Sequence, residues 1–177
     1  MPPPIETERL RLRPFRENDA AQAYDVLERD PEVWRYDPGF QRSFEQRAEL
    51  VRKYASTNDA EGAGNLAVIV RETGQLAGYV GLQHYILPTR PLATPEVELF
   101  YKLGRAYWGQ GIATEACQAL LDFAFDTLCL KRIVTQVAAD NRGSIALLER
   151  LGMRIEPAPP LWSPDVQGVL ENPRSQE

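Results

Sequence analysis

The segment from Trp108 to Ala116 is the part of this chain whose residue types point most directly to chemistry. Two glycines, Gly109 and Gly111, follow a strand-like run and directly precede an amphipathic helix. The free N–H groups of a helix's first turn carry roughly half a positive charge, and glycines let the preceding backbone turn its own N–H groups the same way. We expect a pyrophosphate here. Nucleoside triphosphates and NAD are poor candidates, because the P-loop lysine and the third glycine of a dinucleotide fingerprint are absent.

Two elements must position this turn. Residues 96–103 alternate like a strand, which puts Glu98 and Lys102 on the face opposite Leu99. The helix runs from about Thr114 to Leu128, and its apolar residues recur at three and four positions, so it presents one buried stripe. The turn is therefore expected between a sheet and a packed helix.

The rest of the chain alternates strand-like and helix-like stretches. Strands are predicted at 9–13, 66–70, 76–82 and 132–137, and weaker ones at 154–155 and 166–170. Helices are predicted from the cap at 17–19 to a point before Pro31, and from the capping box at 43–46 to about Tyr54. The four prolines within 156–164 are expected to bar regular structure. The pattern alone indicates an α/β domain with a mixed sheet.

Three ordered blocks of sequence resemble the GNAT acetyltransferases, in the branch that includes the ribosomal-protein-alanine N-acetyltransferases. Motif A of the family is resembled by residues 98–103 and 107–116. The branch's Asn-x-x-Ser helix, which ends in Leu-Gly-Phe, is resembled by residues 141–144 and 148–153. The first strand of the branch is resembled by residues 6–14. The resemblance implies one α/β (α+β) domain over residues 1–177. Its mixed, mostly antiparallel sheet would splay at a cofactor cleft and be flanked by about four helices.

The resemblance also implies acetyl-CoA as cosubstrate and no metal. The pyrophosphate would bind the backbone N–H groups of the turn, pantetheine would pair with the preceding strand, and the N–H of Leu103 would hold the thioester carbonyl. Trp108 stands where many members have Arg or Gln, so an ionic contact is lost there. The cofactor-binding residues expected on this basis are Tyr101, Lys102, Leu103, Trp108, Gly109, Gln110, Gly111, Ile112, Ala113, Thr114, Asn141 and Ser144.

Acyl transfer to an amine needs a base for the amine proton and help for the leaving thiolate. Glu98 is the expected base, with Glu96 as the second choice; a solvated or salt-bridged strand glutamate is the alternative. Many members place a Tyr acid where this chain has Leu148, so by resemblance Ser144 would hold or protonate the sulfur. Ser144 could equally serve helix capping, and Asn141 could cap the helix, contact pantetheine or do both.

The sequence says less about the residues that bind the amine acceptor. An aromatic cluster at Trp34, Tyr36 and Phe40 lies where the family builds its acceptor pocket, and could instead close the edge of the core. His84, the single histidine, is a structural hydrogen-bonder or faces the acceptor, and Glu96 is a further substrate-binding candidate. Three functions compete: acetylation of a protein or peptide N-terminal α-amine, acetylation of a small amine (polyamine, amino acid or aminoglycoside), and a non-catalytic acyl-CoA-binding module.

Composition limits the partners. The net charge of −5 argues against non-specific nucleic-acid binding and mildly favours a cationic substrate such as an amine. The sequence shows no apolar run of about 18 residues and no charged-then-apolar leader, so we expect a cytoplasmic protein without membrane contact. The two cysteines, Cys117 and Cys129, have no metal spacing and are expected in the core. The expected assembly is a monomer or a homodimer.

Overall fold

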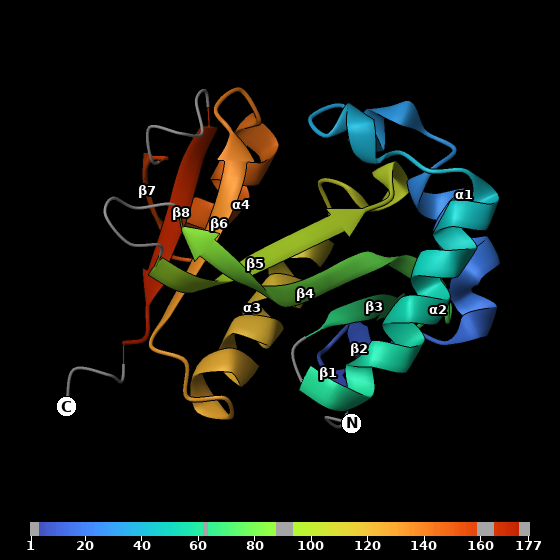
Figure 1. The fold of residues 1–177 in the computed structure, drawn as a ribbon, viewed down its shortest axis with the longest axis horizontal. Coiled ribbons are helices and arrows are strands. Elements are labelled where there is room, and N and C mark those ends of the chain that lie inside the picture. The colour runs from blue at the N-terminus through green and yellow to red at the C-terminus, as the bar shows by residue number, and fades with distance from the viewer. Residues whose placement is uncertain (1–3, 62–63, 88–93, 159–164, 174–177) are drawn as a thin grey trace. The chain divides into compact units, whose positions relative to one another are not determined.

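The computed structural model describes residues 4–61, 64–87, 94–158 and 165–173 (Figure 1). The strands are β1 (Ile5–Glu6), β2 (Leu10–Pro14), β3 (Asn65–Val70), β4 (Leu76–Leu87), β5 (Thr94–Leu103), β6 (Arg132–Ala138), β7 (Arg154–Pro157) and β8 (Asp165–Glu171). The α-helices are α1 (Ala20–Leu27), α2 (Phe44–Glu61), α3 (Ile112–Asp126) and α4 (Arg142–Arg150). Short 3₁₀ turns are η1 (Glu17–Asp19), η2 (Pro31–Trp34), η3 (Pro38–Phe40) and η4 (Arg105–Tyr107).

The strands form an eight-stranded sheet in the order β1-β2-β3-β4-β5-β6-β8-β7. Most neighbours run antiparallel, whereas β5 and β6 are parallel. In the described part of the chain, the register of β5 with β6 is a single partner pair, Glu98 opposite Val134. The predicted α/β fold is confirmed, with its four α-helices and its mixed sheet that splays at the parallel pair.

The chain separates into two compact units, and three elements run through both. The first unit holds residues 1–81 and 101–119, and the second holds 82–100 and 120–177. The boundary therefore falls within β4, β5 and α3. The single domain expected from the sequence stays a prediction, and each unit is described by itself. None of the helices in the described ranges has the length and apolar character that crossing a bilayer requires.

The core of the first unit joins α1 and α2 to the sheet. Six buried side chains form one cluster: Phe15, Ala23, Val51, Ala67, Ile69 and Leu76. The predicted capping box opens α2, since Ser43 N–H donates to Gln46 Oε1 at 2.9 Å and Ser43 Oγ accepts from Gln46 N–H at 3.3 Å. The helix continues to Glu61, well past the predicted end near Tyr54, because no breaker occurs before Gly62.

The second unit packs α4 and the end of α3 with strands β6 to β8. Leu121, Ile133, Leu148 and Val169 are almost fully buried there. The expectation that prolines bar regular structure after residue 156 is wrong at Pro157, which ends β7. The reason is that β7 is the last strand of the sheet, and an edge strand tolerates the missing N–H. Residues 159–164, with the other three prolines, lie outside the described residues.

The two cysteines differ. Cys117 is buried in α3, as expected, and burial raises the pKa of its thiol. Cys129 is exposed just after α3, which corrects its assignment to the core. It follows the end of the helix at φ +54°, so it belongs to the turn that stops α3 rather than to its apolar stripe.

Candidate functional site

The turn before α3 has the backbone that an anion site requires. Gly109 and Gly111 have φ of +70° and +75°, in the left-handed region that side-chain-bearing residues rarely occupy. The helix begins at Ile112, two residues before the predicted start, because Gly111 already accepts the first helical hydrogen bond, from Glu115 N–H at 3.0 Å. The N–H groups of the first turn have no partner within the helix. Residues 108–111 are exposed, so a ligand can reach them.

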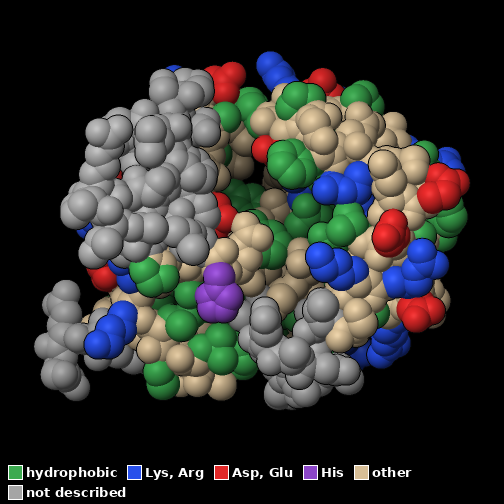
Figure 2. Space-filling view, in the orientation of Figure 1, with side chains coloured by type: hydrophobic (Ala, Val, Ile, Leu, Met, Phe, Trp, Pro, Cys, Tyr) green, Lys and Arg blue, Asp and Glu red, His purple; other side chains and the backbone are tan. Residues whose placement is uncertain are grey.

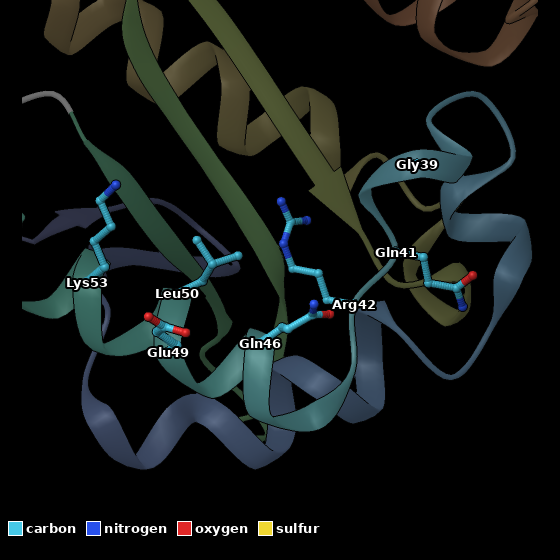
Figure 3. A pocket seen from close by; sticks show the side chains of 7 residues that line it. All are labelled: Gly39, Gln41, Arg42, Gln46, Glu49, Leu50 and Lys53. Atoms are coloured by element: carbon cyan, nitrogen blue, oxygen red, sulfur yellow. The ribbon is translucent and has the colours of Figure 1, made fainter.

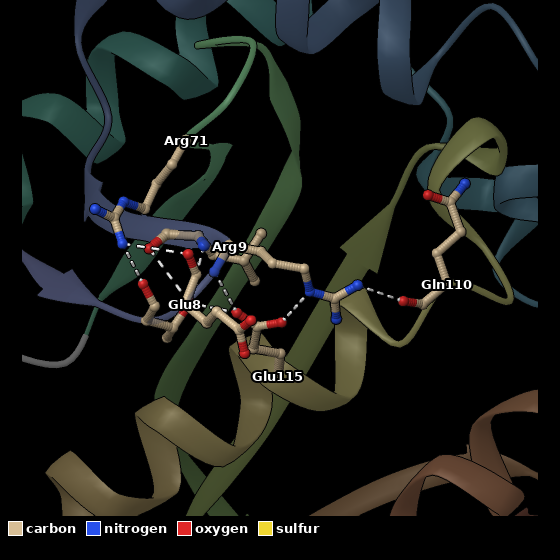
Figure 4. A network of polar contacts seen from close by, with 7 residues as sticks. Glu8, Arg9, Arg71, Gln110 and Glu115 are labelled. Carbon is tan, nitrogen blue, oxygen red and sulfur yellow. Dashed lines mark hydrogen bonds and ion pairs between the residues drawn. The ribbon is translucent and has the colours of Figure 1, made fainter.

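Arg9, in the first unit, hydrogen-bonds to this turn and to the start of α3 (Figure 4). Its Nη1 donates to the carbonyl oxygen of Gln110 at 2.8 Å, and its Nε donates to Glu115 Oε2 at 2.6 Å. In a trans peptide the carbonyl and the next N–H point in opposite directions. Because the Gln110 carbonyl points toward Arg9, the N–H of Gly111 points away from Arg9. It is then available to an anion at the exposed turn.

Glu115 lies in the first turn of α3, where its charge would oppose a bound anion. Its Oε1 accepts from the Thr7 hydroxyl at 2.5 Å and from Arg9 N–H at 2.9 Å. Burial raises the pKa of Glu115, but the hydrogen bonds from Thr7 and Arg9 outweigh it and hold that pKa below its usual value. The carboxylate is thus ionised and paired with Arg9, which offsets its repulsion of an anion. Nothing in the sequence indicates this pairing, which spans 106 positions.

The end of β5 is held at close range by β4. A Cβ on Gly78 would lie 2.1 Å from the carbonyl oxygen of Lys102 and 2.8 Å from Leu103 Cα, so only glycine allows this approach. The carbonyl of Leu103 accepts from Trp108 Nε1 at 2.9 Å, while the indole remains 47% exposed. Trp108 therefore braces the turn against the strand that resembles the pantetheine-binding segment.

Lys102 points to the segment between α1 and α2. Its ammonium lies 2.5 Å from Asp37 Oδ2 and 4.6 Å from the centroid of the Trp34 ring. Trp34 is 3% exposed, and its indole N–H donates to the carbonyl of Leu27 at 2.6 Å. Trp34 therefore packs at the edge of the core, and the substrate-binding roles expected for Trp34 and Tyr36 stay predictions. Two neighbouring aromatic side chains stay at the surface, Tyr36 and Phe40.

Glu98 lies in the second unit with an environment suited to a base. Its half-buried carboxylate accepts from Gln83 Nε2 at 2.6 Å. Burial raises the pKa of Glu98, and hydrogen bonds from Gln83 and the backbone of Gln136 partly counteract this, so the pKa stays above its ordinary value. A pKa moved upward toward neutrality makes the carboxylate a better proton acceptor. Gln83 was not singled out from the sequence, because its pairing depends on how β4 approaches β5.

Glu96 is less suited to a base. Its side chain is 10% exposed, and Oε1 lies 3.4 Å from Arg132 Nε, so the carboxylate is ion-paired. His84 is exposed on β4 and is the purple side chain of Figure 2. The substrate-binding roles expected for Glu96 and His84 stay predictions.

Asn141 and Ser144 meet at the start of α4. Asn141 Oδ1 accepts from Ser144 N–H at 3.2 Å, so Asn141 caps the helix. Ser144 contributes its backbone N–H to this cap, and its hydroxyl makes no hydrogen bond within the described ranges. Leu148, where a tyrosine acid would stand, is fully buried. The structure thus places the turn and Leu103 in the first unit, and Glu98, Asn141 and Ser144 in the second.

Comparison with known proteins decides the family. A family model described as an acetyltransferase (GNAT) domain matches residues 9–154. The chain belongs to the GNAT family. It is therefore an acyltransferase, an acetyl-CoA-dependent N-acetyltransferase.

Three relatives illustrate this GNAT assignment. The protein p20 of Bacillus licheniformis, described as an N-acetyltransferase, is 34% identical over 156 residues, which cover 86% of this chain and 83% of p20. The solved structure of an acetyltransferase from Agrobacterium tumefaciens is 30% identical, with a TM-score of 0.76 over 97% of this chain and 95% of that one. RimL, described as a ribosomal L7/L12 α-N-protein acetyltransferase in complex with coenzyme A, shares the fold at 20% identity, with a TM-score of 0.73 over 96% and 98% of the chains.

Proposed function

We propose that this GNAT protein acetylates the N-terminal α-amine of a protein or peptide and binds the cofactor pyrophosphate on the turn at 108–114. The observation that carries the cofactor assignment is the pair of left-handed glycines, Gly109 and Gly111, before α3. RimL, which shares the fold, supports the acceptor class, because it is described as an α-N-protein acetyltransferase in complex with coenzyme A. The cytoplasmic location and a monomeric or dimeric state stay predictions.

The residues fit the cofactor by their chemistry. Acetyl-CoA supplies an acetyl group activated as a thioester. The N–H groups of residues 109–113 would be the donors for its phosphates, because the Trp108 N–H already donates to the carbonyl of Arg105 at 3.1 Å. They form an anion site without a basic side chain at Trp108. The backbone of Tyr101–Leu103 pairs with the pantetheine arm, as the family resemblance implies, and the Leu103 N–H donates to the thioester carbonyl oxygen. Such a donor stabilises negative charge as it develops on that oxygen.

Two side chains of the second unit move the protons. Glu98 accepts the proton that the acceptor amine must lose before its nitrogen can attack. Ser144 donates its hydroxyl hydrogen bond to the sulfur that leaves as the carbon–sulfur bond gives way to a carbon–nitrogen bond. Because a thiol is a good leaving group, this help is expected to be modest. Asn141 holds the first turn of α4 and thereby positions Ser144.

The cofactor assignment is tested by the variant Gly111→Glu. It places a side chain at a left-handed position, with its Cβ 3.3 Å from Arg9 Nη2, and adds a negative charge to the turn. The strained and more negative turn should no longer bind the pyrophosphate, so acetyl-CoA should no longer raise the unfolding temperature. Gly74→Glu is the matched control, because Gly74 has φ of +68° and open space around it in the β3–β4 turn. If acetyl-CoA stabilises Gly111→Glu as much as the parent, the turn is not the phosphate site.

The acceptor class is tested with a panel of amines and acetyl-CoA, read by release of free thiol. Peptides with a free N-terminus should be acetylated faster than polyamines, free amino acids or aminoglycosides. A higher kcat/KM for one of the small amines would overturn the peptide assignment and leave the acetyltransferase assignment intact.

A further inference from the structure

The peptide group between Leu103 and Gly104 is held by hydrogen bonds on both of its sides. The carbonyl oxygen of Leu103 accepts from Trp108 Nε1 at 2.9 Å, and the N–H of Gly104 donates to the carbonyl oxygen of Ala77 at 2.9 Å. All four residues belong to the first unit. Because a peptide group is planar, two such bonds fix its orientation. The end of β5 is therefore held in place just before the chain turns toward α3.

A β-bulge in β4 supplies the partner on one side. The register of β3 with β4 shifts between Val68 and Ile69, which leaves Ala77 as an extra residue of β4. A bulge redirects the backbone of its strand. The carbonyl of Ala77 accepts from Gly104 in this way, and Gly78, the next residue, lets β5 approach closely.

The same arrangement directs the N–H of Leu103 away from β4. The carbonyl oxygen of Lys102 lies so close to Gly78 that an added Cβ would stand 2.1 Å from it. In a trans peptide the carbonyl and the following N–H point in opposite directions. The Leu103 N–H, which follows the Lys102 carbonyl, therefore points away from Gly78, and β4 does not use this donor.

Trp108 joins this peptide group to the turn before α3. Its backbone directly precedes Gly109, the first left-handed glycine of the turn, and its indole N–H reaches the Leu103 carbonyl. One side chain thus spans the distance from the turn to the end of β5. In acetyl-CoA the pyrophosphate and the thioester are joined by the pantetheine arm, so one cofactor molecule bound at the turn can also reach Leu103.

We propose that Trp108 is a positioning residue for acetyl transfer, because its indole and the bulge at Ala77 fix the Leu103 N–H where the thioester oxygen gains negative charge. This role rests on the proposed function, in which that N–H donates to the thioester carbonyl oxygen. Such a donor is effective only within about 2.7–3.1 Å of the position that the oxygen takes in the transition state. A loosely held end of β5 would lose this effect without losing the cofactor.

The first test compares turnover with cofactor binding in Trp108→Phe, which keeps an aromatic ring and loses the Nε1 donor. We expect kcat to fall about 10-fold, because the Leu103 N–H is no longer held in its productive position. The KM for acetyl-CoA and the Kd for coenzyme A should change less than about threefold. Tyr107→Phe is the matched control, because it removes a hydrogen bond of the neighbouring residue, from its hydroxyl to Gln75 Oε1 at 3.4 Å, and should keep kcat.

Infrared spectra of bound acetyl-CoA, labelled with ¹³C at the acetyl carbonyl, report on the donor directly. A hydrogen bond to the oxygen lowers the stretching frequency of the carbonyl, so the parent should show one narrow band below that of Trp108→Phe. Gly78→Ala should move the band the same way, because its Cβ would stand 2.8 Å from Leu103 Cα. Gly74→Ala is the control for this variant, since Gly74 has φ of +68° with open space around it, and should leave the band in place.

A groove beside α2 is the alternative place for the thioester within this unit (Figure 3). It has a volume of about 480 Å³, and its described lining residues come from the segment 39–42 and from α2. None of these residues belongs to β4, to β5 or to the turn. Leu50→Trp, which places a larger side chain in the groove, should therefore leave both the carbonyl band and the KM for acetyl-CoA unchanged.

Each outcome either supports or contradicts the role of Trp108. A Trp108→Phe variant with the kcat and the carbonyl band of the parent contradicts it and leaves the proposed function standing. An equal loss of kcat in Tyr107→Phe, or a loss of cofactor affinity as large as the loss of kcat, also contradicts it. The same holds for a band that moves in Leu50→Trp and not in Trp108→Phe.

The opposite combination separates this role from the proposed function. A band that depends on Trp108, in a parent that transfers acetyl to no amine, supports the positioning of the donor and overturns the proposed function. Thermal unfolding shows whether each variant is folded. Trp108→Phe, whose change lies at an exposed side chain, carries the test if Gly78→Ala does not fold.

Discussion

Arg9 and Glu115 form an ion pair, with Nε and Oε2 2.6 Å apart, although 106 positions separate them in the sequence. The pair joins the residue directly before β2 to the first turn of α3, and the same guanidinium donates to the carbonyl of Gln110 at 2.8 Å. One side chain thus neutralises the acidic residue beside the turn and orients a peptide group within it. The turn has no basic side chain at position 108, and Arg9 places a cation beside it instead.

The first prediction concerns Arg9. In Arg9→Met the Gln110 carbonyl loses its charged donor and Glu115 keeps an unpaired charge near the pyrophosphate, so the Kd for coenzyme A should rise about 10-fold. Calorimetry with coenzyme A provides the measurement. Acetylpantetheine, which carries the thioester but no phosphate, should be used with unchanged KM.

Arg11→Met is the control for this prediction, because Arg11 is an exposed arginine of β2 that pairs with Glu6 instead. It should leave coenzyme A affinity near that of the parent. An equal loss for coenzyme A and acetylpantetheine in Arg9→Met would show a general structural effect and contradict a role at the phosphates.

The second prediction is that Glu98→Gln lowers kcat by about 10²-fold at neutral pH with little change in cofactor affinity. The base acts when it is deprotonated, so the rate of the parent should rise with pH through a pKa that burial places above the ordinary value for Glu98. The variant should lose that rise. Glu96→Gln, which removes one of the carboxylates paired with Arg132 and leaves Glu171, is the control and should keep the pH profile.

The third prediction uses Gln83, which donates to Glu98 at 2.6 Å and lowers its pKa. In Gln83→Leu the carboxylate loses a hydrogen bond that favours its charged form, so its pKa should rise further. The pH–rate profile should therefore move to higher pH, with the rate lost mainly on the acid side. An unchanged pH–rate profile would show that Gln83 has no influence on the proton transfer.

The fourth prediction separates Ser144 from Asn141. Ser144→Ala should lower turnover by about 10-fold and change cofactor binding by less than a few-fold, as expected for a group that acts mainly in the transition state. Asn141→Ala removes the cap of α4 and should lower the free energy of unfolding by about 1 kcal/mol, measured in urea. A Ser144→Ala variant with full turnover would contradict a role of the hydroxyl and leave Ser144 only the backbone N–H that it donates to the Asn141 cap.

The fifth prediction concerns the ion pair of Glu28 with Arg47, in which both side chains are 1% exposed. Arg47→Met leaves the Glu28 carboxylate buried without its partner, so the free energy of unfolding should fall by about 3–5 kcal/mol. Urea unfolding measures the loss. The double variant Glu28→Leu/Arg47→Met should recover much of it, because no charge is then left buried, and a double variant as unstable as the single one would contradict this account.

Much of the fold is determined by local sequence pattern. The capping box at Ser43, the alternation of β5 and the apolar stripe of α3 depend on neighbouring residues, and all three elements form where the pattern predicts them. The ends of β5 and α3 lie within two residues of the prediction, whereas α2 continues to Glu61, past its predicted end near Tyr54. The glycine turn is of the same kind, because Gly109 and Gly111 fill positions with positive φ next to a helix start. Resemblance to GNAT proteins then indicated the chemistry, which the family match confirmed.

The tertiary structure alone decided which side chains meet. Arg9 reaches Glu115 and Gln83 reaches Glu98 because residues of different elements become neighbours in space, and no periodicity encodes such a pairing. Burial is equally non-local: Trp34 is 3% exposed, whereas Tyr36, two positions further along the chain, stays at the surface. The sequence by itself thus determined the elements and the kind of site, because these follow from local backbone preferences. Only the fold decided the electrostatic environment of each functional group, because a charge responds to whatever surrounds it in three dimensions.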